Sequence, residues 1–222
     1  IGAINNMYPS AVNSMFENCQ KLRKLPEFKN FNSSKLLSYA YANASSMFSG
    51  CNCLREIDFD ILKLFVNSLT TSTYYSLYYR LAFHCSTLDS LKLPVILADY
   101  TSNVFSQSVD HCLRLKSFTF ETNEDGSPIV ANWKNQTIDL STVGYVASST
   151  VANLLTNPDM TDANKVTDDA SYQALKDDPD WWTQDMAYSR YNHDSAVETL
   201  KSLPDCSASG KTNTIKFKAH SG

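Results

Sequence analysis

The cysteines and histidines are the side chains of this chain that could bind a metal or act as nucleophiles. They cluster as Cys51-x-Cys53, His84-Cys85 and His111-Cys112, and thiolate and imidazole are the ligands that zinc prefers. Four of the cysteines, however, hold one equivalent place in a repeated pattern, and free cysteine is among the most buried residue types. We therefore expect a ladder of buried thiols and no bound metal, with a zinc site or a disulfide as the alternatives.

Two other motifs have the residue types of a functional site. His193-Asp194-Ser195 contains the three residue types of a hydrolase triad, but triad members converge from separate segments, so we expect Asp194 or Ser195 to cap a helix instead. Asn123-Glu124-Asp125-Gly126 lacks the later ligands of a calcium loop, and a turn is the better interpretation. We accordingly predict no catalytic residues, no cofactor and no enzymatic activity.

A repeat organises the first half of the chain. Met15-Phe16-Glu17-Asn18-Cys19-Gln20-Lys21-Leu22-Arg23-Lys24-Leu25 recurs as Met47-Phe48-Ser49-Gly50-Cys51-Asn52-Cys53-Leu54-Arg55-Glu56-Ile57, and weaker copies follow around Cys85 and Cys112. The four cysteines lie 27 to 34 residues apart, a period typical of stacked repeat units. The expected buried ladder consists of Phe16, Cys19, Leu22, Phe48, Cys51, Leu54, Phe83, Cys85, Leu88, Cys112 and Leu115.

Short strands are expected after the repeated leucine. Apolar and polar residues alternate in Ile57-Asp58-Phe59, Leu91-Lys92-Leu93 and Phe118-Thr119-Phe120, the period of a strand with one buried face. One unit cannot bury its apolar face alone, so stacked units would form one continuous core. The sequence predicts an α/β protein, a right-handed solenoid of irregular leucine-rich repeats over residues 1–145.

The Met-Phe-x-x-Cys-x-x-Leu-x-x-apolar pattern resembles the BspA-like leucine-rich-repeat family, which includes surface proteins of gut and oral bacteria and phage-associated members. The resemblance covers roughly residues 11–140. It implies adhesion or recognition and brings no catalytic residues with it.

The second half has a different character. Residues 146–190 are rich in Asp, Asn, Ser and Thr and carry helix-start signals such as Asp178-Pro179, which predict a helix-rich insertion. Residues 191–222 are expected to form a final, truncated repeat, with a helix after Asn192 that ends before Pro204 and a strand over 213–218.

Two aromatic clusters are the candidate binding residues, because flat rings stack on sugars or anchor protein interfaces. They contain Trp181, Trp182, Tyr188 and Tyr191, and Tyr75 and Tyr79 from the stretch Tyr74–Tyr79. For the tryptophan-containing cluster, the favoured interpretation is that it forms the core of the inserted helices, and binding is the alternative if a tryptophan is exposed.

Composition narrows the functional classes. The net charge of −4 offers no broad attraction to nucleic acid, and no apolar run is long enough for membrane insertion. We expect an extracellular binding or structural module on a bacterial surface or a phage virion, with a surface protein, a glycan or other virion proteins as partner. The alternative is a targeting appendage of an enzyme whose catalytic domain lies outside this segment.

Overall fold

The computed structural model describes residues 13–26, 44–66, 77–85, 87–97, 103–112, 114–143 and 191–217. The insertion expected at 146–190 lies outside these residues and stays a prediction. Within them, no helix is long and apolar enough to cross a membrane.

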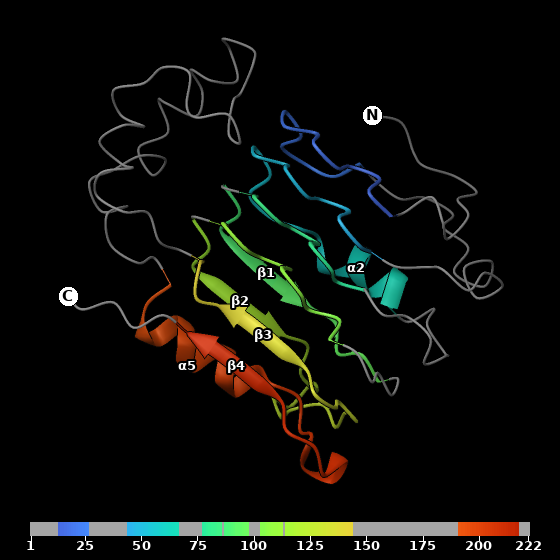
Figure 1. Cartoon of the computed structure of the whole chain (residues 1–222), viewed down its shortest axis with the longest axis vertical. Helices are drawn as coiled ribbons and strands as arrows, with labels where there is room; N and C mark the ends of the chain where they lie inside the picture. The colour runs from blue at the N-terminus through green and yellow to red at the C-terminus, as the bar shows by residue number, and fades with distance from the viewer. Residues whose placement is uncertain are drawn as a thin grey trace, which may run out of the picture.

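Two short parallel sheets and two α-helices form most of the described secondary structure (Figure 1). In chain order the elements are α2 (Phe59–Val66), β1 (Ser90–Leu93), β2 (Ser117–Phe120), β3 (Thr137–Leu140), α5 (His193–Ser202), a 3-10 turn (Ser207–Ser209) and β4 (Thr214–Phe217). β1 pairs with β2, and β3 pairs with β4, both in parallel. Parallel partners require the chain to make a full circuit between them.

Four segments that each end at a cysteine lie side by side and consist of consecutive β-turns. We call them turn segments 1 to 4, and they contain residues 13–19, 44–51, 77–85 and 103–112. In turn segment 2 the N–H of Met47 bonds to the carbonyl of Ala44, and the N–H of Cys51 bonds to that of Phe48. The third residues of these turns, Ser46 and Gly50, have φ of 54° and 73°, as in a type II turn.

The remaining backbone donors of a turn segment bond to the next segment. The N–H groups of Ser46, Phe48 and Gly50 donate to carbonyls of turn segment 3 over 2.8, 2.9 and 2.8 Å. In the same way, every second N–H group of turn segments 1 and 3 donates to a carbonyl of turn segments 2 and 4, respectively. These hydrogen bonds between segments offset the cost, about 1 kcal/mol per residue, of holding non-glycine residues such as Ser46 in a left-handed backbone.

The described chain forms two layers with the core between them, and the turn segments belong to one of these layers. β3 continues the layer of turn segments, since the N–H of Thr137 donates to Asn103 Oδ1 over 3.1 Å. β1 and β2 lie in the opposite layer, and α5 packs against β2, where the N–H of Phe120 donates to Ser202 Oγ over 3.0 Å. The circuit that contains β3 therefore has helix α5 in the opposite layer, where the preceding circuit has strand β2.

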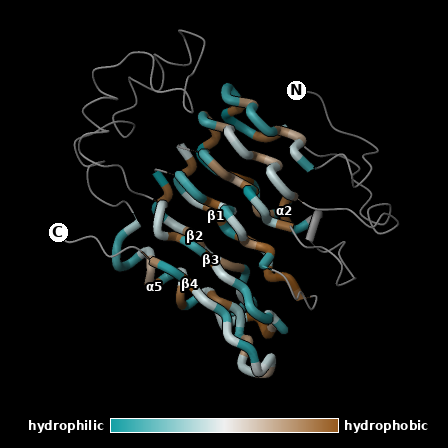
Figure 2. Tube along the Cα trace, in the orientation of Figure 1, coloured by the Kyte–Doolittle hydropathy of each residue, from teal (hydrophilic) through white to brown (hydrophobic). Residues whose placement is uncertain are grey.

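Alternation along β1, β2 and β3 defines the buried face of each of these strands. Leu91 and Leu93 of β1 and Phe118 and Phe120 of β2 are buried, while the residues between them face outward. Hydrophobic and hydrophilic residues alternate along these parallel segments in Figure 2. Burial of this apolar area at about 25 cal/mol per Å² is the main stabilising term.

Two local expectations are wrong. Phe59 begins helix α2 and does not end a strand, because the carboxylate of Asp58 accepts hydrogen bonds from the N–H groups of Asp60 and Ile61 and so caps a helix. The N-cap of α5 is Asn192, whose Oδ1 accepts from the N–H of Ser195, and neither Asp194 nor Ser195 has that role. By contrast, β1, β2 and β4 lie where alternation predicts strands.

Candidate functional site

The thiols of three turn segments make one repeated hydrogen bond. Each donates to the carbonyl of the residue that lies three positions before the cysteine of the preceding segment. The pairs are Cys51 to Phe16 over 3.0 Å, Cys85 to Phe48 over 2.9 Å and Cys112 to Ala82 over 3.0 Å. The three cysteines are fully buried, so their sulfur atoms form a column inside the molecule.

The buried thiols of this column contribute to packing and are not suited to reaction or metal binding. Burial raises the pKa of the Cys51, Cys85 and Cys112 thiols well above the usual range, and the first two are raised further by a neighbouring cysteine. A protonated thiol is a poor nucleophile and a poor metal ligand. No group of three or more metal-binding side chains occurs among the described residues.

Thiol labelling should distinguish these positions. With a maleimide under native conditions at pH 7.5, we expect Cys19 to react quickly because it is exposed. Cys51, Cys85 and Cys112 should react only on unfolding, because they are buried and protonated. Peptide mass spectrometry reports the modified position, and rapid native labelling of Cys85 would contradict the buried column.

Two members of the expected buried ladder are not buried. Cys19 is exposed, because no described segment precedes turn segment 1 to cover it. Phe83 is partly exposed, and the position equivalent to Phe48 is held by the fully buried Ala82. Among the other expected ladder positions, Phe16 stacks on Phe48 with ring centroids 5.8 Å apart, and Leu54, Leu88 and Leu115 are fully buried.

The expected aromatic sites are only partly described. Tyr75, Trp181, Trp182 and Tyr188 lie outside the described residues and stay predictions. Tyr79 is partly buried, with its ring 5.9 Å from the Arg80 guanidinium. Tyr191 is 8% exposed, and burial raises its pKa to about 12 while its hydroxyl contacts Thr199. Tyr191 therefore contributes to packing in this structure.

A notch crosses the outer face of the turn layer, and the sequence interpretation missed it. Its floor is Ser49 and Gly50 of turn segment 2, and it encloses about 300 Å³. One wall is formed by Glu17, Asn18 and Gln20, and the other by Arg80, Phe83 and His84. We call this feature the segment-2 notch.

The notch exists because turn segment 2 has small residues where its neighbours have large ones. Asn18, Gly50, His84 and His111 each precede the cysteine of their segment, and all have φ between 59° and 73°. Gly50 has no side chain in this column, and the Asn18 side chain leans over it, with Oδ1 2.5 Å from where a Cβ on Gly50 would lie. The signal was present in the repeat, as Ser49-Gly50 aligned with Glu17-Asn18.

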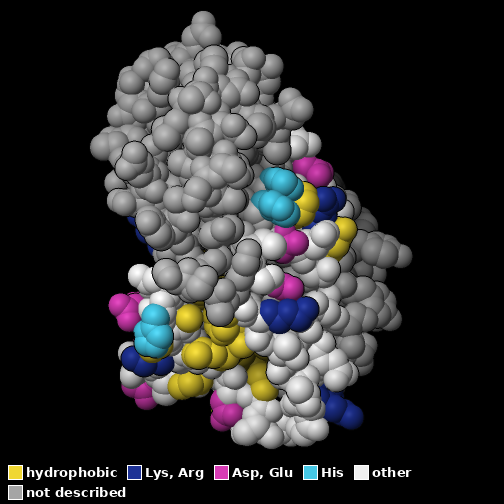
Figure 3. Space-filling view, turned by 60° about the vertical axis from the view of Figure 1, so that its left-hand side comes forward, with side chains coloured by type: hydrophobic (Ala, Val, Ile, Leu, Met, Phe, Trp, Pro, Cys, Tyr) yellow, Lys and Arg dark blue, Asp and Glu magenta, His cyan; other side chains and the backbone are white. Residues whose placement is uncertain are grey.

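Aromatic and cationic side chains build the turn segment 3 wall. The Arg80 guanidinium lies 3.9 Å from the centroid of the Phe83 ring, and the His84 and His111 rings stack with centroids 4.5 Å apart. Figure 3 shows two adjacent histidines at the surface beside hydrophobic, basic and acidic side chains. Burial, with His111 and Arg80 nearby, lowers the pKa of His84, so this ring is neutral at pH 7.

Several polar side chains of the notch have no partner within the described part of the protein. In the described part of the chain, the side chains of Glu17, Asn18, Gln20 and Ser49 make no hydrogen bond or ion pair, and Arg80 Nε is buried with no hydrogen-bond partner. A buried donor without a partner is rare in native proteins and costs about 1 to 3 kcal/mol. The notch thus has unmet hydrogen-bonding capacity at one small place.

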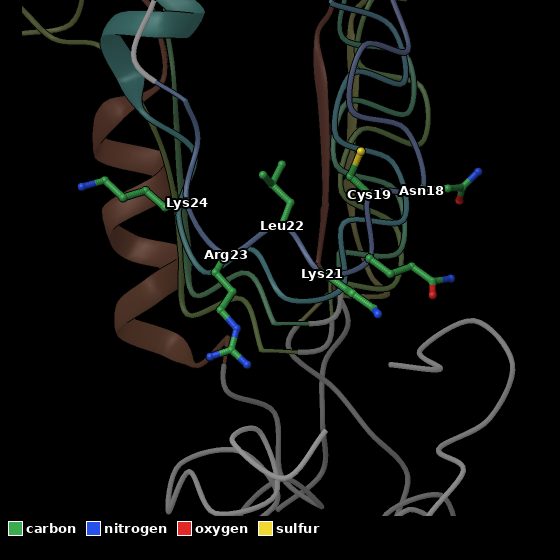
Figure 4. Close-up of a pocket in the computed structure, with 7 residues that line it drawn as sticks. Asn18, Cys19, Lys21, Leu22, Arg23 and Lys24 are labelled. Carbon is green, nitrogen blue, oxygen red and sulfur yellow. The ribbon is translucent and has the colours of Figure 1, made fainter. Parts of the chain in front are cut away.

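A second hollow lies at the open end of turn segment 1. It encloses about 600 Å³ and is lined by residues 18–24. In Figure 4, Leu22 points between the two layers, whereas Lys21, Arg23 and Lys24 point away from the core. The hollow is therefore the uncovered end of the described stack.

No protein-family model, curated protein or solved structure matches this chain.

Proposed function

We propose that this chain is a non-catalytic recognition module, built as a leucine-rich-repeat solenoid of the BspA-like type. On this proposal it works outside the cell, on a bacterial surface or a phage particle, and binds a surface protein, a glycan or a neighbouring virion protein. The resemblance of the Cys19 and Cys51 repeats to that family motivates the location and the class of partner.

The observation that carries the proposal is the difference between the inward and the outward side chains of the turn segments. The three described inward thiols each donate to a carbonyl of the preceding segment, and so they have a packing role. The outward positions of turn segments 1 to 3 carry the unpartnered polar side chains of the segment-2 notch. A rigid scaffold that presents variable outer residues suits recognition.

Binding to intact bacteria tests the proposal. Fluorescently labelled chain should bind gut or oral bacterial cells, or phage particles prepared from them, saturably and in competition with unlabelled chain. Flow cytometry and particle sedimentation measure the bound fraction. Incubation with isolated cell walls should release no new reducing ends or peptides, because the proposed role has no turnover.

Two results would count against the proposal. One is the absence of saturable binding to every cell and particle preparation. The other is catalytic release of fragments from cell walls by the isolated chain. Mass spectrometry of purified phage particles then separates a virion component from a protein of the bacterial surface.

A further inference from the structure

We propose that the segment-2 notch binds one uncharged sugar ring of a surface glycan through hydrogen bonds to its hydroxyl groups. This inference rests on the proposed recognition function and names its ligand class and its site.

The size of the notch fits a single ring. Its volume of about 300 Å³ is at the lower limit of small-molecule pockets. Turn segments 1 and 3 flank one segment between them, and adjacent parallel segments lie about 4.8 Å apart, so the wall backbones are about 10 Å apart. A single six-membered sugar ring in its chair form enters such a slot on its edge, while a folded protein surface does not.

The hydrogen-bonding groups of the notch require a ligand that both donates and accepts. The Arg80 guanidinium is only a donor, whereas Glu17 is only an acceptor. Asn18, Gln20 and Ser49 do both. Neighbouring hydroxyl groups on a sugar satisfy these opposite demands together, because each hydroxyl donates one hydrogen bond and accepts others.

The charges of the notch favour an uncharged ligand. Glu17 and Arg80 contribute opposite charges from opposite walls, and the lowered pKa of His84 keeps its ring neutral. Asp110, next to turn segment 3, adds a second carboxylate close to Arg80 and His111. A carboxylated sugar or an acidic peptide would meet Glu17 and Asp110 as well as Arg80, so it gains little from the cation.

The backbone of the floor does not offer an edge to a peptide. The N–H groups of Phe48 and Gly50 donate to turn segment 3, and the N–H groups of Ser49 and Cys51 close turns within turn segment 2. An extended peptide that adds to a sheet needs such donors free. Recognition at the notch therefore depends on side chains.

The experiment compares three variants with the unaltered chain. Gly50→Asn adds a side chain to the floor and displaces the Asn18 side chain that leans over it, with a residue that tolerates a left-handed backbone, as Asn18 does at the equivalent position with φ of 59°. Arg80→Ala removes the guanidinium of one wall. Gln107→Ala is the matched control, because Gln107 is exposed, has φ of 55° against 52° for Arg80, and lies at the equivalent position of turn segment 4.

The probes are methyl glycosides of glucose, galactose, mannose and N-acetylglucosamine, with glucuronic acid as the charged counterpart. Calorimetry and saturation-transfer NMR measure the Kd at 20 and 300 mM NaCl. We expect at least one uncharged glycoside to bind with a Kd that changes less than about twofold with salt, since no net charge is neutralised. Arg80→Ala should weaken binding roughly tenfold or more, Gly50→Asn should abolish it, and Gln107→Ala should change it less than about twofold.

Several outcomes overturn the inference. These are binding of none of the uncharged glycosides, tighter and strongly salt-dependent binding of glucuronic acid, or equal binding by the Gly50→Asn variant with unchanged circular dichroism. If Gly50→Asn fails to fold, Arg80→Ala against Gln107→Ala decides the question alone. The cell-binding assay keeps the two proposals apart, because unaltered binding of cells by the Arg80→Ala variant would reject the notch but leave the recognition function standing.

Discussion

Alanine in place of Leu54 is expected to lower the free energy of unfolding by about 3 kcal/mol or more. Leu54 is fully buried between the layers, and truncation of such a leucine removes its transfer free energy and leaves a cavity. Urea unfolding followed by circular dichroism measures the change, provided that the slope of the transition is unaltered.

Leu22→Ala is the matched control, because Leu22 lies three residues after Cys19 as Leu54 lies three residues after Cys51. Leu22 is 9% exposed and lies at the end of the described stack, with a described repeat on one side only, so its truncation should cost less than that of Leu54. If Leu22→Ala destabilised the protein as much as Leu54→Ala, the continuous core between stacked segments would be the wrong description.

Asp89→Asn is expected to lower the free energy of unfolding by about 3 kcal/mol, at the low end of the range for a broken buried ion pair, because Asp89 is partly exposed. The Asp89 carboxylate lies 3.1 Å from Nε of Arg114, whose side chain is 1% exposed. Arg55 and Lys116 approach it at 3.6 and 3.9 Å from more exposed positions. The substitution leaves a buried guanidinium without its carboxylate.

A double variant separates the pair from its surroundings. Asp89→Asn combined with Arg114→Met should recover much of the lost stability, because an apolar side chain of similar length needs no counter-charge. Chemical denaturation of the two single variants and the double variant gives the coupling energy. Strictly additive losses would mean that Arg114 does not depend on Asp89.

The spacing of the repeat contained enough information to place β1, β2 and most of the buried positions. A leucine follows each repeated cysteine by three residues, and apolar and polar residues tend to alternate after that leucine. Burial of one side of the chain imposes both features, so they recur as a period in the sequence. The fully buried Leu88 and Leu115 lie where this rule puts them, although their repeats match the pattern less well.

The third repeat shows where that reasoning fails. Phe83 is the conspicuous aromatic residue before Cys85, yet the turn geometry fixes the inward position three residues before the cysteine, and Ala82 holds it. A small residue at an inward position is less conspicuous than a phenylalanine one residue away. Residue type misled where the hydrogen-bonded spacing of the turns would have decided correctly.

The segment-2 notch was hidden from sequence reasoning for a related reason. Its walls come from turn segments 1 and 3, about 65 residues apart in sequence, and no local motif joins Glu17 to Arg80. What creates it is the absence of side-chain volume at Ser49 and Gly50. A search for chemically active residues therefore passes over the floor and sees the walls only as unrelated polar positions.

The backbone N–H groups of a turn segment alternately close its own turns and bond to the next segment. The two residues before each cysteine lie on the outer face of the turn layer, away from the thiols. These side chains differ in size from repeat to repeat, as Glu17-Asn18, Ser49-Gly50 and Asp110-His111 illustrate, while the cysteine that follows them stays the same. The outer surface of the turn layer is therefore shaped one repeat at a time, apart from the hydrogen-bonded thiols on its inner side.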